Sequence, residues 1–349
     1  MRYIVCFPGG GFNDMLSVIN RCIKHAIKYN RLLIIDTTKT EWFAKDIHDY
    51  ISFSHKNIYN GSLNDIYATI KKLSIYPENM TITLTRSRIP WKFRTYNFDL
   101  NKDYTEDVLV YYMSGGGIPY ETLKHMYVKP NVLNVYYERL NKLSINYNSF
   151  HIRNTDKKSD NLELFIKNNE QYLNESGFLA SDDANIINMI KEKYKKIITF
   201  SSIPELASSQ KNIHYNHIGI EQELFIVDCI VDILLLASGE RFFFSCPESG
   251  YSKLANYLFE NKQILNKILI NKISDIIQIN QDVKKHNIVI ENIENHNIDK
   301  HNIENNKITK IQIDMSRSTM KYKSPKVCSK KKYKPNHSVD LSQLEKKLI

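Results

Sequence analysis

Apolar and polar positions near the N-terminus follow the pattern of a strand, a helix and a second strand. Residues 3–8 are an apolar run, and residues 31–36 form another that is apolar almost throughout. Between them, Leu16, Ile19 and Ile23 recur at helical spacing. Continuously apolar strands are typical of parallel sheets that are covered on both faces. The segment therefore predicts a βαβ unit with parallel strands.

The same alternation of strands and helices returns along the chain as far as about residue 270. We expect helices over 41–51, 62–73, 120–142, 161–174, 185–196, 221–238 and 251–259. We expect strands over 80–86, 107–113, 177–181, 197–200 and 241–245, together with a short strand that ends near 150. Strands alternating with helices predict α/β architecture with parallel sheets. The pattern divides into two Rossmann-like halves, an N-terminal domain at 1–142 and a C-terminal domain at 143–270.

Beyond residue 271 the pattern is replaced by low-complexity sequence. Asn followed by Ile recurs every fifth residue from Asn287 to Asn302, in too few copies to bury a repeat core. From Ser316 onward there are ten Lys or Arg and two Asp or Glu, which gives +8 of the net +10 and leaves +2 for residues 1–315. We expect 271–349 to be a disordered tail, basic at its end. Because the rest is nearly neutral, nucleic acid is not an expected partner, and the tail is better explained as a solubilising extension than as an adhesive arm.

Cysteine usage and the lack of a leader indicate a cytoplasmic protein. The five cysteines are scattered, without a CxxC pair, as expected in a reducing compartment without a structural zinc. The chain contains no run approaching the ~20 apolar residues of a membrane span. The N-terminal apolar run is too short for a signal peptide.

Two glycine-rich turns follow predicted strands of the first half. Gly9–Gly11 precede the first predicted helix, and glycines there let backbone N–H groups and a helix N-terminus approach an anion. The turn matches neither the GxGxxG pattern nor a Walker A loop, so a close-packed turn stays an alternative. A second run, Gly115–Gly117, follows the strand predicted at 107–113. The basic and aromatic cluster between Arg86 and Arg94 could face a sugar or phosphate, or could be a surface loop.

A charged stretch, Phe150–Lys157, begins the second half. Side chains alternate along a strand, so His151 and Arg153 are expected to point the same way from its end. A guanidinium can bind a phosphate with two parallel hydrogen bonds, and ligands bind beyond the carboxyl ends of parallel strands. The alternative is a solvated strand end whose charges pair with one another.

Four segments together resemble the GDP-fucose-dependent fucosyltransferases, which include the α1,6, α1,2 and protein O-fucosyltransferase groups. The segment 9–16 is similar to the glycine/asparagine loop of the superfamily, and 151–157 resembles its His-x-Arg-x-x-Asp signature, closest to the α1,6 group. The segments 178–194 and 232–252 resemble the second and third motifs of the α1,6 group. The resemblance covers about 1–265.

The resemblance implies a GT-B glycosyltransferase that transfers fucose with inversion, without a metal or other cofactor. It places the donor in the cleft, mainly on the second half, with a glycan acceptor on the first. By position, Arg153 would bind the β-phosphate and stabilise the departing diphosphate, and His151 and Asp232 would lie at the guanosine end. Further donor contacts would come from the residues Gly9, Gly10, Gly11, Asn13, Asp182, Ser245 and Ser249.

Several positions depart from the family pattern. Asn154 replaces the second of two adjacent arginines, and the phosphate-binding serine could be Ser249 or Ser245. The proposed base of the α1,6 group falls on Asn161. An inverting transfer to a hydroxyl still needs a general base, for which the candidates are Asp14, Asp160 and Glu163, in that order.

Three alternatives stay open. Asp182 and Asp183 could be a metal-binding pair of the GT-A kind, although a helix cap with a role in the donor loop is preferred. The donor could be another nucleotide sugar. The chain could also be a non-catalytic nucleotide- or glycan-binding protein of the same fold, which Asn154 and Asn161 favour. The acceptor, the linkage and the oligomeric state are not set by the sequence.

Overall fold

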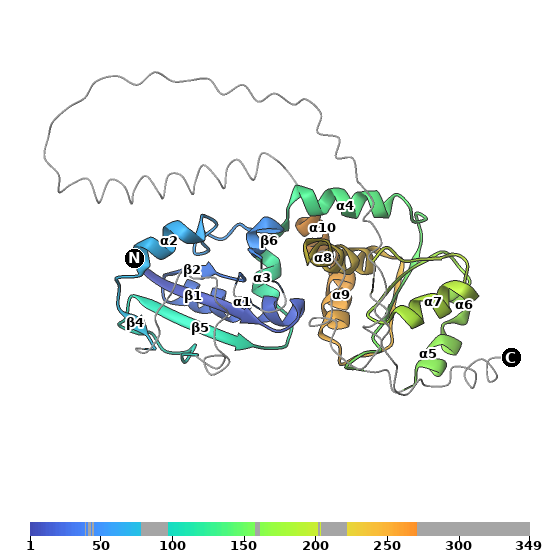
Figure 1. Cartoon of the computed structure of the whole chain (residues 1–349), viewed down its shortest axis with the longest axis horizontal. Helices are drawn as coiled ribbons and strands as arrows, with labels where there is room; N and C mark the ends of the chain where they lie inside the picture. Colours follow the sequence, from blue (N-terminus) through green and yellow to red (C-terminus); the bar gives the residue numbers. More distant parts are fainter. Residues whose placement is uncertain are drawn as a thin grey trace, which may run out of the picture. The chain divides into compact units, whose positions relative to one another are not determined.

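The N-terminal half of the chain is built on a parallel four-stranded sheet (Figure 1). The computed structural model describes residues 1–38, 40, 43, 45–77, 97–157, 161–201, 203 and 222–270. The strand order is β2-β1-β5-β4, and each neighbouring pair is parallel. The strands are β1 (Arg2–Gly9), β2 (Arg31–Ile35), β4 (Ile75–Tyr76) and β5 (Val108–Ser114). The helix α1 (Phe12–Lys28) connects β1 to β2, which confirms the predicted βαβ unit.

A second parallel sheet forms the C-terminal half, in the order β10-β7-β8-β9. Its strands are β7 (Asn148–Ile152), β8 (Gly177–Ser181), β9 (Ile197–Ile198) and β10 (Arg241–Phe244). Its helices are α5 (Leu162–Asn168), α6 (Glu170–Leu173), α7 (Ala184–Lys193), α8 (Gln222–Ser238), α9 (Gly250–Glu260) and α10 (Lys262–Leu269). The mixed α/β class with parallel sheets is therefore confirmed. The sequence pattern missed α10.

Two stretches of the chain before β7 differ from the prediction. The helix predicted at 41–51 is wrong at its end, where a short 3-10 helix, η1 (Ile47–Asp49), leads into the strand β3 (Ile51–Phe53). The helix predicted at 120–142 is divided into α3 (Tyr120–His125), β6 (Met126–Val128) and α4 (Pro130–Leu140). A proline disfavours helical geometry in the residue before it and favours the first turn of a helix, so Pro130 starts a new helix. The helix predicted at 62–73 is found as α2 (Leu63–Ile70), and the strand predicted at 80–86 lies outside the described residues.

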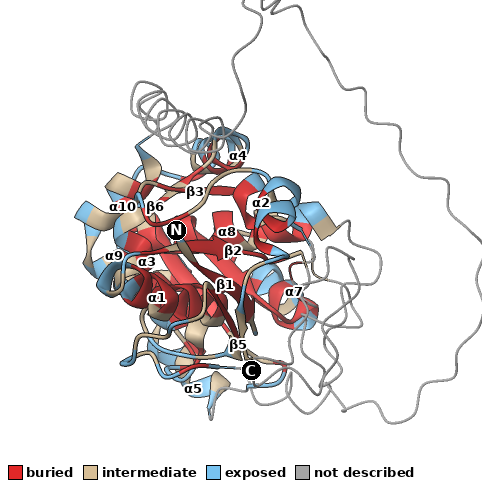
Figure 2. Ribbon diagram, turned by 90° about the vertical axis from the view of Figure 1, so that its left-hand side faces the viewer, coloured by how far each residue is buried: buried red, intermediate tan, exposed pale blue. Residues whose placement is uncertain are grey.

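The interior is assembled from the strands and from the inward faces of the helices. Figure 2 shows β1 and β2 in the colour of buried residues, whereas α2 carries buried and exposed residues on opposite sides. The largest apolar cluster includes residues of both halves, for example Ile4 of β1 and Phe178 of β8. All described residues belong to one compact unit, Met1–Glu294. The division into domains at residue 142 therefore stays a prediction.

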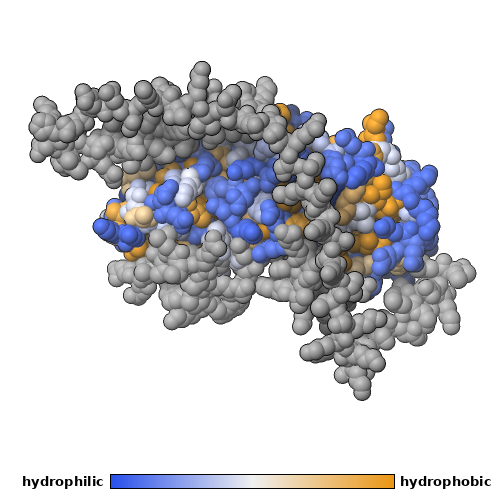
Figure 3. All heavy atoms as spheres, turned by 45° about the horizontal axis from the view of Figure 1, so that its top comes forward, coloured by the Kyte–Doolittle hydropathy of each residue, from blue (hydrophilic) through white to orange (hydrophobic). Residues whose placement is uncertain are grey.

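The surface offers no membrane-spanning element within the described residues, where every helix is too short or too polar to cross a bilayer. On the face drawn in Figure 3, hydrophilic residues are interspersed with apolar ones. The tail predicted at 271–349 lies outside the described residues.

Candidate functional site

The carboxyl ends of β7, β8 and β10 lie at one edge of the second sheet. In the register of these strands, His151 is level with Ala180 of β8 and Phe244 of β10. The residues that follow each strand, Arg153, Asp182 and Ser245, are therefore brought together there. This edge is where open parallel sheets bind ligands.

A pocket opens at this edge, with an empty volume of about 600 Å³ when the space open to solvent is included. Four predicted site residues line it, namely His151, Arg153, Asp182 and Asp232. The other lining residues are Phe12, Ala180, Ser181, Ser201, Ile203, Phe225, Asp228, Cys229 and Tyr251. The pocket thus combines an apolar wall with a few charged groups.

Arg153 is the cationic group of this pocket. Its guanidinium forms ion pairs with Asp156, through Nη2, and with Asp182, through Nε at 3.0 Å from Oδ2. The Nε–H group is buried and makes no hydrogen bond, because it is not aimed at the neighbouring carboxylate. The Arg153 backbone N–H donates to Ser245 Oγ at 3.2 Å. The arginine is held at the strand end and retains an unused donor.

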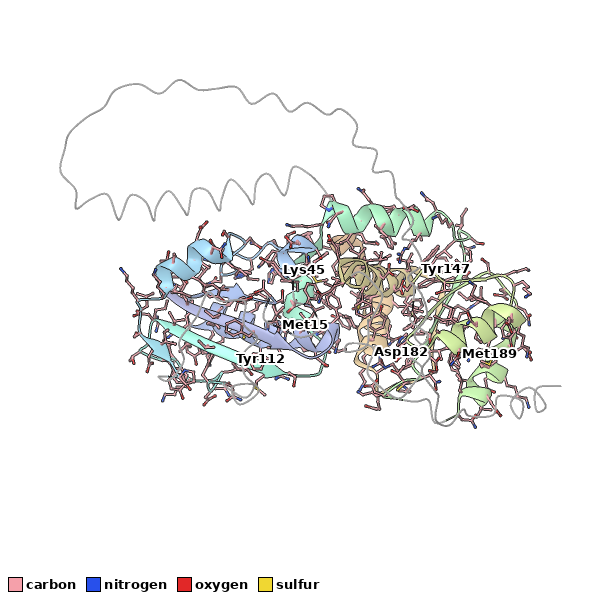
Figure 4. All side chains as sticks on the ribbon, viewed as in Figure 1. Met15, Lys45, Tyr112, Tyr147, Asp182 and Met189 are labelled. Carbon is pink, nitrogen blue, oxygen red and sulfur yellow. The ribbon has the colours of Figure 1, made fainter. Side chains whose placement is uncertain are left out.

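Asp182, which is labelled in Figure 4, and Asp183 organise the loop around Arg153. Asp182 accepts from the backbone N–H of Asn154 at 2.8 Å and from the Thr155 hydroxyl, and burial raises the pKa of its carboxyl. Asp183 caps α7, since Oδ1 accepts from the Asn185 N–H at 2.9 Å, and Oδ2 accepts from the Asn154 side chain at 2.7 Å. The expected helix cap is confirmed, with Asp183 as the cap. Asn154, which replaces the second arginine of the family pattern, braces this loop.

His151 is a neutral group inside the pocket wall. Nδ1 lies 2.6 Å from the hydroxyl of Ser252 on α9, and the ring packs on Tyr251 at 5.0 Å between centroids. Burial and, to a smaller extent, the positive charge of Arg153 together lower the pKa of His151 to about 3. The imidazole therefore offers hydrogen bonds, without a charge, near neutral pH.

Asp232 belongs to a buried cluster of charges on α8 and α4. Asp228 and Asp232 lie one helical turn apart on α8, and Arg139 of α4 contacts both. Arg139 Nη2 donates to Asp228, whereas Nη1 lies 3.5 Å from Oδ1 of Asp232 without a hydrogen bond. The Ser201 hydroxyl donates to Oδ2 of Asp232, so Oδ1 is a buried acceptor with no hydrogen-bond partner. Burial raises the pKa of Asp232 to about 7.

The predicted site residues of the first glycine turn do not line this pocket. Gly9 ends β1, Gly10 has a φ of +89°, and Gly11 is the N-cap of α1. Asn13 of α1 is buried beside Gly250 of α9, and a Cβ added to Gly250 would lie 3.0 Å from Nδ2 of Asn13. Oδ1 of Asn13 makes no hydrogen bond. Phe12, between these residues, does line the pocket. The turn therefore contacts the site through Phe12 and through the start of α9.

Asp14, the first candidate for the general base, lies in the first turn of α1. Burial raises the pKa of its carboxyl, opposed by a hydrogen bond from the Gly11 backbone and by the charges of Lys157 and Arg21. A hydrogen bond back to the N-cap residue is the arrangement of a capping box, so Asp14 also has a structural role. Its carboxylate lies next to the second glycine turn, where an added Cβ on Gly116 would be 3.8 Å from Oδ1.

The remaining candidates lie outside the pocket or outside the described residues. Ser249 caps α9 by accepting from the Ser252 N–H at 3.3 Å. Asn161 caps α5, and Glu163 is exposed in the first turn of the same helix. Asp160 and the cluster from 86 to 94 are not among the described residues.

Sequence reasoning missed four groups of the site. Phe12, Phe225 and Tyr251 form part of the apolar wall, and Arg139 is the counter-ion of the two α8 carboxylates. Asp228 was visible only as an interruption of an apolar helix. The available signal was the spacing of two acidic residues four positions apart in an otherwise apolar helix. Because charged side chains are rarely buried unless they are paired, this spacing indicates that a counter-ion lies nearby.

Comparison with solved structures gives one consistent result. NodZ α1,6-fucosyltransferase co-crystallized with GDP matches with a TM-score of 0.51 and 13% identity over 74% of this chain and 93% of that chain. Fucosyltransferase NodZ from Bradyrhizobium matches with a TM-score of 0.50 at 13% identity, over 74% and 93% of the two chains. The fold is that of the fucosyltransferases. POFUT1 in its apo form also matches, at a TM-score of 0.47 and 13% identity, over 73% of this chain and 94% of that chain. No protein-family model and no curated protein matches the sequence.

Within the described part of this fucosyltransferase-like chain, no cluster of three or more His, Cys, Asp or Glu side chains is arranged to hold a metal ion. The acidic pair Asp182–Asp183 is engaged with Arg153, Asn154, Thr155 and the cap of α7. Both carboxylates are therefore engaged with groups of the protein.

Proposed function

We propose that this protein is a GT-B glycosyltransferase that transfers fucose from GDP-fucose to a glycan hydroxyl, with inversion and without a metal ion. The observation that carries the proposal is the pocket lined by both Arg153 and Asp232, whose buried Oδ1 has no hydrogen-bond partner. A guanine base offers N1–H and N2–H₂ donors side by side, and a carboxylate is the acceptor that suits them. Arginine suits a diphosphate.

The proposed nucleotide would be held by polar groups and by the apolar wall. Asp232 would accept from the guanine, His151 would offer a neutral hydrogen bond, and Phe12, Phe225 and Tyr251 would exclude water from the base. Exclusion of water makes these hydrogen bonds selective for guanine. A base that did not match them would leave buried polar groups unpaired, which is costly.

Arg153 would act on the departing diphosphate. Its ion pairs with Asp156 and Asp182 hold the guanidinium at the strand end. A β-phosphate would take the unused Nε–H and replace one of these carboxylates. Negative charge develops on the diphosphate as the sugar leaves, so a guanidinium fixed beside it lowers the barrier.

A base is still required to take the proton of the acceptor hydroxyl. Asp14 is the proposed base because burial raises the pKa of its carboxyl and because it lies beside the second glycine turn, whose residues carry no side chains. A raised pKa brings a carboxylate closer to the working range of a general base.

The proposal is tested by incubating the protein with GDP-fucose and a mixture of glycans, followed by mass spectrometry of the glycans and detection of released GDP. Fucosylated product is expected from GDP-fucose with EDTA present, and its formation should be lost in Arg153→Ala. Transfer that requires a uridine donor, or that stops with EDTA, would contradict the proposal.

A second candidate is a non-catalytic nucleotide- or glycan-binding protein of the same fold. The observation that favours it is Asn161, which occupies the position of the family's proposed base and serves as the exposed cap of α5. Tight GDP binding with no release of GDP from GDP-fucose, in the presence of any glycan tested, would favour this candidate.

A further inference from the structure

Two carboxylates that line the pocket share one guanidinium, that of Arg139 on α4. Asp228 and Asp232 are 5% and 6% exposed, and Arg139 is 9% exposed. With both acids ionised the cluster carries one excess negative charge, which is costly to bury without further donors. Arg139 does not serve the two carboxylates equally. It donates a hydrogen bond to Asp228, whereas its Nη1 only approaches Oδ1 of Asp232, at 3.5 Å.

We propose that Arg139 is a positioning residue that engages Asp228 in a hydrogen bond, leaves Oδ1 of Asp232 without one so that it can accept from the nucleotide base, and with Asp228 sets the pH range in which the base is bound. This inference rests on the proposed function, since it takes guanine as the group that Asp232 accepts from. Arg139 and Asp228 thereby determine the charge of the base-reading carboxylate, Arg139 from outside the set of residues that line the pocket.

Among the described residues, few titratable groups surround Asp232. The titratable and charged groups around it from α8, α4, α9 and the ends of β7 and β8 are Asp228, Cys229, Arg139, Tyr251, His151, Arg153 and Asp182. Burial keeps Cys229, Tyr251 and His151 neutral at pH 7, since it raises the pKa of the first two and lowers that of His151. Arg153 and Asp182 pair with each other. Asp228, which raises the pKa of Asp232, and Arg139, which lowers it, are therefore the controlling charges.

The sign of the pH effect follows from the chemistry of the hydrogen bonds. A protonated Asp232 presents an O–H where the guanine needs an acceptor, so binding requires the ionised form. Burial raises the pKa of this carboxyl to about 7. GDP affinity should therefore be constant above that pH and fall by roughly tenfold for each pH unit below it.

The experiment measures GDP dissociation constants by calorimetry from pH 5.5 to 8.5 for the full chain and three variants. Asp228→Asn removes the repelling charge and should move the acid midpoint down by roughly one unit. Arg139→Gln removes the stabilising charge and should move the midpoint up. Arg139→Lys keeps the charge and should keep the midpoint near that of the wild type, even if the variant is less stable.

Opposite shifts in Asp228→Asn and Arg139→Gln would support the inference, because a purely structural role gives no such reversal. Protons carried by GDP itself contribute equally to every curve and cancel in the comparison. Equal midpoints in all proteins, shifts in the same direction, or affinity independent of pH would overturn the inference while leaving GDP binding established. No GDP binding by the wild type at any pH would overturn the proposed function and the inference with it. Because Asp228→Asn can still accept from Arg139, that variant stays informative if Arg139→Gln fails to fold.

Discussion

Replacing Asp232 with Asn should separate recognition of the base from the stability of the fold. Ser201 donates to Oδ2 of Asp232, so the amide oxygen of the new Asn is expected at that position. The amide NH₂ then takes the place of Oδ1 and faces the N–H donors of the guanine. The ion pair between Arg139 and Asp228 is untouched, so Arg139 keeps one of its two carboxylate partners and no buried charge is left without a counter-ion.

The size of the effect follows from these contacts. A hydrogen bond to a charged group contributes about 1.5–3 kcal/mol, and two guanine donors lose their acceptor. Allowing for relaxation, we expect a loss of about 3 kcal/mol, roughly 150-fold in the dissociation constant for GDP. Inosine diphosphate, which lacks the 2-amino group, should bind the wild type roughly tenfold more weakly than GDP. This preference should disappear in the variant.

The assay is calorimetric titration with GDP and with inosine diphosphate at pH 8, where Asp232 is ionised. Thermal unfolding without ligand serves as the control, and its midpoint should not fall, because the substitution removes a buried carboxylate. An unchanged ratio of GDP to inosine diphosphate affinity in Asp232→Asn would refute the assignment of Asp232 to the base.

Three further outcomes follow from the structure. Arg153→Ala should lower the affinity for GDP by at least roughly tenfold and leave that for guanosine unchanged, because only the diphosphate would contact the guanidinium. Competition binding measures both affinities, and equal losses for the two ligands would contradict this role. Gly10→Ala should destabilise the fold by about 1–3 kcal/mol in urea unfolding, since φ is +89° and an added Cβ would lie 2.8 Å from Asp14 Cβ. Gly116→Ala is the matched control, with 3.8 Å to the nearest atom, and an equal cost for both would refute the argument. EDTA should leave the rise in unfolding temperature caused by GDP unchanged, and a loss of that rise would show a metal requirement.

The regular part of the fold was predictable because apolar periodicity reflects burial directly. The strands β1, β2, β7 and β8 and the helices α1, α7 and α8 are each within a few residues of their expected bounds. The prediction was wrong between residues 120 and 142, where helix-like spacing hid the short strand β6. That strand is stabilised by its antiparallel pairing with β3, a contact between distant residues that no local pattern encodes.

The site was only partly predictable for a related reason. His151 lies near the end of β7, and Arg153 and Asp182 follow β7 and β8, so their convergence could be inferred from the rule that parallel strands end at a common edge. Arg139 could not be found in this way, because it lies on α4 and meets Asp228 only through helix packing. Asp14 was selected from the sequence for its charge. The structure shows that its carboxylate also accepts a hydrogen bond from the backbone of the N-cap residue Gly11. A sequence alone cannot distinguish an acidic residue with this structural role from a catalytic one.

The central claim is that the pocket binds a guanine nucleotide sugar, and a calorimetric panel of GDP-fucose, GDP-mannose, GDP, UDP and CMP tests it most directly. The wild type should bind GDP and GDP-fucose at pH 8, with EDTA present, and should bind UDP and CMP at least roughly a hundredfold more weakly. Arg153→Ala and Asp232→Asn should each weaken GDP-fucose binding. A preference for UDP, or equal binding of all the nucleotides, would contradict the claim.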